Sequence, residues 1–414
     1  MGFFKCIICI VILAFSGVEC EMRHENGNPY VFNDEDFTTL FKTEEGKVKV
    51  LEKFTERSEL FRGIENIRML FFEANPQTFF IPSHWDSDIL FFVAQGRGTI
   101  SLVFEDRRES FNIQKGHLMT IPSGITFYMI NSDENETLVL ASFVKPIANP
   151  GHFAPFFGVG GQDPESFYYA FSPEVLETAF NASIDRLQTA FSQQGKGVII
   201  RATKDQIKAL TAEEDSQLPF GNSYCLKKFG PCQIFSHLRD STEFGKLYMV
   251  DPSEYVKLQE LDMYISFSIT SQGCMSTPFH STRVVKIIMV VNGQGRFEMA
   301  APYEEEGSTR IRYKKISSEL RRGMVFVIPP GHPTVIMASQ DKSLETLNLE
   351  FFAKGNERFL LAGRGNIMKN FQKEAKELAF ATSAEKVDEI LDSQQLDFFM
   401  RGPTRFNPQD TATF

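Results

Sequence analysis

The sequence predicts a mainly β protein with two β-barrels (jelly rolls) in tandem, each followed by an α-helical extension. Three observations support this fold class: a pattern of strands and turns that occurs twice, a period of two in the strands, and a helical stripe after each copy. With 414 residues, 42% hydrophobic and 23% charged, the composition is that of a globular chain, and the length suits two domains.

The repeat is visible in two separated segments. IPSHWDSDILFFVAQGRGTISLVF begins at Ile81, and TPFHSTRVVKIIMVVNGQGRFEMA begins at Thr277. Both run from a proline through polar residues into an apolar strand, a G-x-G turn and an alternating strand. Further on, GHLMTIPSGITFYMIN and GMVFVIPPGHPTVIMA each place a proline six residues, and a second glycine eight residues, after the first glycine. Equal offsets in both copies indicate a duplicated fold.

Each copy has the pattern of short antiparallel strands. Ile100, Leu102 and Phe104 alternate with other residues, which is the period of a half-buried strand. The glycines of the G-x-G turns suit tight hairpins, because glycine readily adopts positive φ. In the second copy the insertion AAPYEEEGSTRIRYKK predicts a longer surface hairpin.

A helical extension is expected after each barrel. Ser172 and Pro173 suit the N-cap and first helical positions. The apolar stripes at helical spacing are Leu176, Phe180, Ile184, Leu187 and Phe191 in the first copy, and Ile367, Phe371, Ala375 and Leu378 in the second, where a short helix after Ser383 adds Val387, Ile390 and Leu391. Such stripes either cover their own barrel or contact another subunit.

The domain division follows from these elements. We expect a secretory signal peptide at 1–20, the first barrel with its arm at 30–200, a polar linker at 204–222, the second barrel with its arm at 223–403, and a tail at 404–414. The apolar run of the leader is too short for a bilayer span of roughly 20 residues, so no membrane partner is expected. The net charge of −10 argues against nucleic acid.

Covalent modification sites are also suggested by the sequence. The segment YCLKKFGPC could close a small loop through a Cys225–Cys232 disulfide, which leaves Cys274 free or buried. Asn135 and Asn181 begin N-x-S/T sequons, which permit glycosylation in the secretory pathway.

Several segments resemble the vicilins, the 7S globulin seed storage proteins of the bicupin superfamily. These segments are PSHWDSDILFFVAQGRGT, VIPPGHPTVIMAS and AGRGNIMKNFQKEAKELAF, and the likeness extends from about residue 30 to 403. The resemblance implies a nutrient reservoir protein with two cupin barrels. It also implies a homotrimer joined head to tail through the helical arms, and deposition in the protein storage vacuole, with an extracellular location as the alternative.

The resemblance also locates the positions where metal-dependent cupins hold their ion, with a His-x-His pair, a Glu and a third His. This chain has Ser83, His84, Asp88, Phe127 and Tyr128 at or near those positions in the first barrel, and Phe279, His280, Ser281 and Lys286 in the second. Because an ammonium group repels a divalent cation, Lys286 argues against a metal there. Neither barrel keeps the set, so we expect no enzyme and no required cofactor.

An alternative function is ligand binding in the second barrel. Cys274, His280 and His332 are candidate ligands for copper or zinc, with incidental redox activity. Strand alternation, however, turns His280 away from the inward face shared by its neighbours. The same three residues, with Arg283 and Lys286, could instead line a pocket for a small anion. A sugar-binding or stress-response cupin is a third hypothesis.

Overall fold

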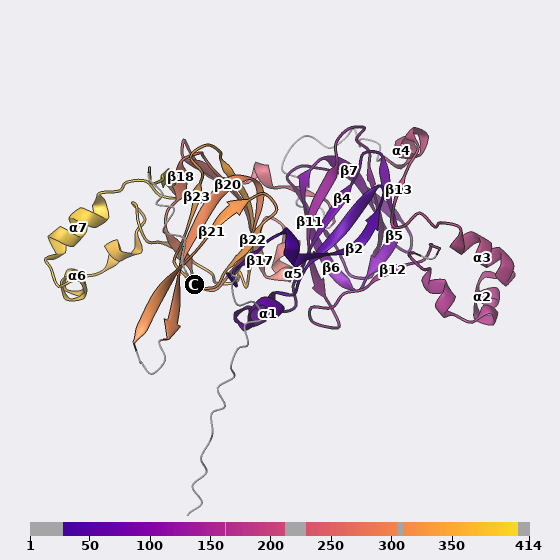
Figure 1. The fold of residues 1–414 in the computed structure, drawn as a ribbon, viewed down its shortest axis with the longest axis horizontal. Helices are drawn as coiled ribbons and strands as arrows, with labels where there is room; N and C mark the ends of the chain where they lie inside the picture. The colour runs from indigo at the N-terminus through magenta and orange to yellow at the C-terminus, as the bar shows by residue number, and fades with distance from the viewer. Residues whose placement is uncertain (1–27, 162, 212–228, 305–309, 405–414) are drawn as a thin grey trace, which may run out of the picture.

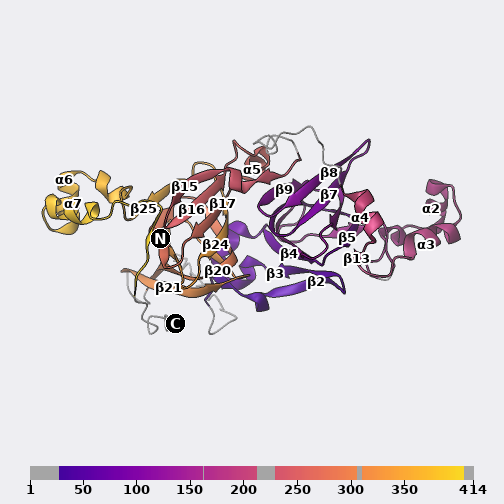
Figure 2. The ribbon, with the colours of Figure 1, turned by 90° about the horizontal axis from the view of Figure 1, so that it is seen from above.

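The computed structural model describes residues 28–161, 163–211, 229–304 and 310–404 and contains two β-barrels side by side. A helical arm projects from each barrel at opposite ends of the molecule (Figures 1 and 2). The predicted fold class is therefore confirmed. The signal peptide expected at 1–20 lies outside the described residues. Within the described ranges no helix is both long and apolar enough to cross a membrane.

The first barrel consists of two antiparallel sheets, one in the order β14-β9-β6-β11-β4-β3-β2 and the other in the order β12-β5-β10-β7-β8, with β13 paired to β5. Its strands are β2 (Phe37–Thr43), β3 (Gly46–Leu51), β4 (Arg68–Ala74), β5 (Thr78–Trp85), β6 (Ser87–Gln95), β7 (Arg97–Val103), β8 (Arg108–Gln114), β9 (His117–Ile121), β10 (Thr126–Asn131), β11 (Leu138–Pro146), β12 (Pro155–Phe157), β13 (Ile199–Arg201) and β14 (Cys232–Gln233). The short helices η1 (Asp34–Asp36), α1 (Phe54–Arg57) and η2 (Glu59–Ile64) precede β4.

The second barrel repeats this plan as one hydrogen-bonded sheet system through which the long strand β20 runs. Its elements are η5 (Ile234–Ser236), β15 (Leu238–Thr242), β16 (Gly245–Val250), α5 (Val256–Leu261), β17 (Met263–Thr270), β18 (Cys274–Ser276), β19 (Phe279–Ser281), β20 (Val285–Glu304), β21 (Ile311–Arg321), β22 (Val325–Ile328), β23 (Thr334–Ala338), β24 (Leu344–Phe351), β25 (Arg358–Leu360) and β26 (Phe399–Arg401). The long hairpin predicted from the insertion is confirmed, because β20 and β21 stay paired out to Glu304 and Ile311.

The two arms share one design. The first arm contains η3 (Phe167–Ala170), α2 (Pro173–Phe180) and α3 (Ile184–Ser192), and the second arm contains η6 (Ile367–Asn370), α6 (Lys373–Phe380) and α7 (Ala384–Asp392). In each arm a residue in the left-handed conformation, Asn181 or Ala381, ends the first helix. The first stripe is therefore divided between two helices, where the spacing alone suggested a single one.

Both faces of strand β6 are buried, which explains its continuous apolar run. Ile89, Phe91 and Val93 point into the core of the first barrel. Leu90 and Phe92 point the other way, into a core that they share with the second barrel. The interface between the barrels is thus built like a protein interior.

Short strands also cross between the barrels. β1 (Val31–Phe32) precedes the first barrel in the chain but pairs with β22 of the second, and β14 pairs with β9 of the first barrel. The division expected at 30–200 and 223–403 therefore separates chain segments that exchange strands. Part of the polar linker predicted at 204–222 is helix α4 (Lys204–Leu210), which buries Ile207 against the first barrel.

A polar pocket inside the second barrel

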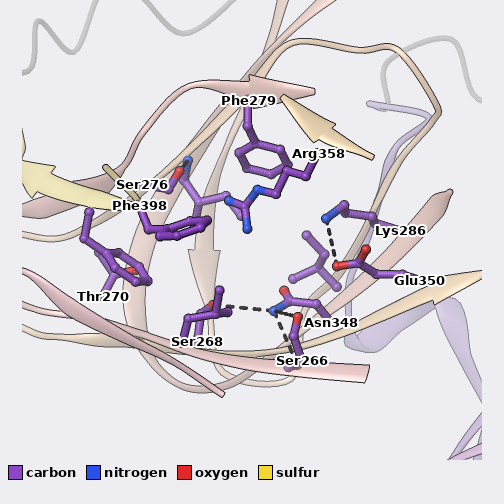
Figure 3. A pocket seen from close by; sticks show the side chains of 14 residues that line it. Ser266, Ser268, Thr270, Ser276, Phe279, Lys286, Asn348, Glu350, Arg358 and Phe398 are labelled. Carbon is purple, nitrogen blue, oxygen red and sulfur yellow. Dashed lines mark hydrogen bonds and ion pairs between the residues drawn. The ribbon is translucent and has the colours of Figure 1, made fainter. Parts of the chain in front are cut away.

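A small pocket with a cavity volume of about 30 Å³ lies inside the second barrel (Figure 3). Strands β17, β20, β24 and β25 supply most of its polar wall. The polar lining residues are Ser266, Ser268, Thr270, Ser276, Lys286, Asn348, Glu350 and Arg358. A cavity of this size holds only water or a very small ligand.

A buried ion pair forms one side of the pocket. Lys286 on β20 and Glu350 on β24 stand directly opposite each other in the sheet register, with Nζ 2.8 Å from the carboxylate oxygen. The two residues are only 3% and 8% exposed. Burial lowers the pKa of the Lys286 ammonium, and the carboxylate of Glu350 opposes that shift. Each of the two charges is therefore stabilised by the opposite charge of its partner rather than by water.

Arg358 brings a second cation into the same pocket. Its guanidinium lies 4.0 Å from the ring centroid of Phe279 and 5.6 Å from that of Phe398. The Nε atom is buried and has no hydrogen-bond partner among the described residues. Burial also lowers the pKa of this guanidinium. Two cations and one carboxylate leave an excess of positive charge, with a donor available for a ligand.

Hydroxyl and amide groups complete the wall opposite the charges. The Asn348 amide donates to the Ser266 hydroxyl at 3.1 Å (Figure 3). Ser268 also shares a hydrogen bond of 2.7 Å with Thr346. These groups belong to neighbouring strands, so the register of β17 and β24 fixes their places.

The first barrel has apolar residues at matching positions. Lys286 and Ile89 each stand seven residues before the first glycine of their G-x-G turn. Opposite Lys286 is Glu350, whereas opposite Ile89 is Val144. Both Ile89 and Val144 belong to the buried core of the first barrel. The two barrels thus share the strand geometry, but the second barrel has a charged pair where the first has an apolar pair.

Of the residues singled out in the sequence, Phe279 and Lys286 line this pocket, and Lys286 is the one candidate ligand residue among them. His280 on β19 faces away from the interior, with its ring against Phe359, as strand alternation predicted. His332 is half-buried, and its Nδ1 lies 3.0 Å from the Pro330 carbonyl oxygen. Neither Cys274 nor the exposed Arg283 contributes to the lining.

The metal candidates do not form a preformed site. Within the described ranges, no group of three His, Cys, Asp or Glu side chains could hold a metal ion. Cys274, His280 and His332 would therefore have to move together to bind copper or zinc, and such a site stays a prediction. Cys274 is a buried free thiol whose pKa is raised by burial.

Sequence reasoning missed Glu350, Asn348 and Arg358. The strand LETLNLEF does alternate, with polar Thr346, Asn348 and Glu350 between leucines. Such alternation is normally read with its polar face toward water. Here the polar face points into the barrel and the leucines point to the shared core. The alternation was therefore visible in the sequence, but its polar face lies inside the barrel instead of in water.

The sequence predicted one disulfide and two glycosylation sites. Cys232 is disulfide-bonded, while Cys225 lies outside the described residues, so their pairing stays a prediction. Asn135 and Asn181 are both exposed, as a glycosylation acceptor has to be.

Comparison with known proteins agrees with this architecture. The Cupin family model matches residues 60–187 and 233–388. A vicilin from Corylus avellana is 45% identical over 394 residues, which cover 94% of this chain and 87% of the relative. The crystal structure of vicilin from Corylus avellana (hazelnut) superposes with a TM-score of 0.85 at 46% identity, covering 91% of this chain and 100% of that one.

A second solved structure is also similar to this chain. It is a vicilin from Solanum melongena, which superposes with a TM-score of 0.84 at 34% identity and covers 91% of this chain and 99% of that one. That protein is described as having different anionic ligands in structurally similar pockets. The double cupin match and the extent of these similarities show that this chain belongs to the vicilin (7S globulin) family of two-barrel cupin storage proteins.

Proposed function

We propose that this chain is a non-enzymatic nutrient reservoir of the seed, delivered through the secretory pathway to a storage vacuole. The observation that carries the proposal is the replacement of the cupin metal-binding positions. Phe279 and Lys286 occupy two of these positions in the second barrel, and the inward positions of the first barrel hold carbon-rich side chains. An acidic protein whose barrels lack the full set of cupin metal ligands suits storage better than catalysis.

The test is the amount and place of the protein during the life of the seed. Quantitative mass spectrometry should show accumulation during filling and loss at germination, and subcellular fractionation should place it with storage vacuoles. A constant and low abundance would contradict the reservoir function while leaving the fold intact.

We further propose that the chain assembles as a homotrimer through its arms. Each arm exposes large apolar side chains: Phe171, Val175 and Phe180 in the first, and Phe371, Leu378, Phe380 and Ile390 in the second. Leu378 and Ile390 are 85% and 72% exposed, which is unusual for a monomer and typical of a surface covered in an assembly.

Light scattering after size-exclusion chromatography tests this assembly. We expect the wild-type protein to elute at three chain masses, and the double variant Leu378→Asp/Ile390→Asp to elute as a monomer. Leu238→Asp, on an exposed leucine of β15, is the matched control and should leave the trimer intact. If the double variant still formed a trimer, the arms would not be the interface between the subunits.

A second function is favoured by the pocket of the second barrel, namely binding of a small anion. The buried Arg358 Nε without a partner and the excess positive charge support it. The anionic ligands of the Solanum melongena vicilin offer a parallel. Because the cavity volume is only about 30 Å³, the ligand has to be as small as acetate or chloride.

Thermal unfolding in sodium acetate, with sodium sulfate at equal ionic strength as reference, tests this function. A ligand that binds only the folded state raises the melting temperature. We expect acetate to raise it for the wild type and for the surface control Arg283→Met, but not for Arg358→Met. Equal shifts in all three proteins would show that acetate does not act by binding in this pocket.

A further inference from the structure

A larger cavity lies where the two barrels meet. Its volume is about 330 Å³, and it shares no lining residue with the polar pocket of the second barrel. Leu90 and Phe143 of the first barrel face Met263 and Phe351 of the second across it, and each of these four side chains is buried. Ligand sites in proteins are commonly apolar cavities of this size at domain interfaces.

The rim of this cavity carries a strained aromatic residue. Phe352 follows β24 with φ of 65°, a conformation that bulky residues rarely adopt. Its ring is 41% exposed and lies beside Gly63 of η2, where a Cβ atom would come within 3.6 Å of it. Strain of this kind persists where the surroundings hold it, and it is often found at ligand sites.

The charged groups of the lining distinguish this cavity from the anion pocket. They are Asp88, Asp262 and Lys145, so carboxylates outnumber cations. Asp88 Oδ1 accepts a hydrogen bond from the Ser123 backbone N–H at 3.0 Å, and Asp262 Oδ1 accepts one from the Lys354 N–H at 2.8 Å. Both carboxylates are thereby held in place, and they disfavour a negatively charged ligand.

We propose that the cavity between the barrels is a binding site for a compact, uncharged aromatic molecule. The apolar lining supplies the burial, the phenylalanine rings supply offset or edge contacts, and the two carboxylates exclude anions. This inference goes beyond the reservoir function and does not depend on the anion pocket.

Fluorescence titration with two matched probes tests the proposal. N-phenyl-1-naphthylamine is uncharged, and 8-anilino-1-naphthalenesulfonate adds one negative charge to nearly the same ring system. We expect one uncharged probe molecule to bind per chain, about tenfold more tightly than the sulfonate does at this site.

A blocking variant assigns the binding to this cavity. Gly63 is exposed and has no positive φ, so Gly63→Trp can fold while its ring fills the rim. We expect it to weaken binding of the uncharged probe about tenfold. The matched control is Gly195→Trp, because a Cβ atom there meets nothing within 4 Å; it should bind the probe as the wild type does.

A second variant keeps the test decisive if Gly63→Trp does not fold. Phe352→Gly suits the left-handed backbone and removes one wall of the cavity, so weaker binding with an unchanged or higher melting temperature is expected. Absence of binding by the uncharged probe would overturn the proposal. So would binding that neither variant alters, or binding of the sulfonate that is as tight and as sensitive to the variants.

Discussion

At the scale of single residues, the buried charges of the second barrel give an asymmetric prediction. Removing Glu350 leaves two cations, Lys286 and Arg358, without a carboxylate, whereas removing Lys286 leaves a balanced pair. We therefore expect Glu350→Gln to lower the free energy of unfolding by about 3–5 kcal/mol, and Lys286→Met by about half as much. Urea denaturation measures both values.

The control for this pair is an exposed one. Lys47 and Glu73 form a surface ion pair of 3.0 Å, so Lys47→Met should change the free energy of unfolding by less than about 1 kcal/mol. If Lys286→Met lowered the free energy of unfolding as much as Glu350→Gln does, Arg358 would not balance the charge of Glu350 once Lys286 is removed.

His117 gives a prediction for pH. Burial lowers the pKa of this imidazole to about 4, against a smaller opposing effect of the Asn112 backbone. The unfolded chain, with an ordinary pKa near 6.5, then binds a proton more readily than the folded protein does. Stability contributed by the neutral form is therefore lost as pH falls from about 6.5 toward 4.

We expect this residue to lower the free energy of unfolding by about 2 kcal/mol between pH 7 and pH 5. His117→Asn should remove that part of the pH dependence, whereas His152→Asn, at an exposed histidine, should retain it. Urea denaturation at the two pH values measures the difference, and an unchanged dependence in His117→Asn would show that other groups cause it.

At the scale of elements, the arms show what spacing can and cannot predict. The stripes correctly predicted helices with apolar faces, and Val387 and Leu391 are indeed buried. The break at Asn181 was not predicted, because an i, i+4 stripe continues smoothly across a left-handed residue. In the second arm the short helix expected after Ser383 is α7, which begins just after the break at Ala381. Ile390, from the same stripe, is exposed, because the spacing of a stripe does not show which of its residues the rest of the chain covers.

The break at Ala381 leads to a substitution whose effect should be stabilising. With φ of 49°, Ala381 pays the cost of about 1 kcal/mol that an L-residue meets in the left-handed region. Ala381→Gly should therefore raise the free energy of unfolding by roughly that amount. Ala375→Gly, in the exposed interior of α6, should lower it by about 0.5–1 kcal/mol. Equal signs for the two variants would argue against strain at the break.

At the scale of the whole molecule, the repeat predicted two barrels because equal offsets in two segments require two copies of one fold. The exchange of short strands was not predictable. β1 contains only Val31 and Phe32, and two residues carry no periodicity. Of the charged residues in the barrel interior only Lys286 was predicted, for a related reason. When both faces of a strand are buried, the pattern does not say which face lies inside the barrel.

This exchange makes the N-terminal segment part of the second barrel's stability. Phe32 is fully buried, pairs with Val325 of β22, and packs edge to face on Phe54 at 5.4 Å. We expect Phe32→Ala to cost about 3–5 kcal/mol. Hydrogen exchange should show the lost protection mainly in β22, more than 290 residues away in the chain, and in its neighbour β20. Phe41→Ala, which removes a ring packed on Phe157 within the first barrel, should instead weaken protection there. If Phe32→Ala left β22 protected and loosened only the first barrel, the crossing strand would contribute nothing to holding the two barrels together.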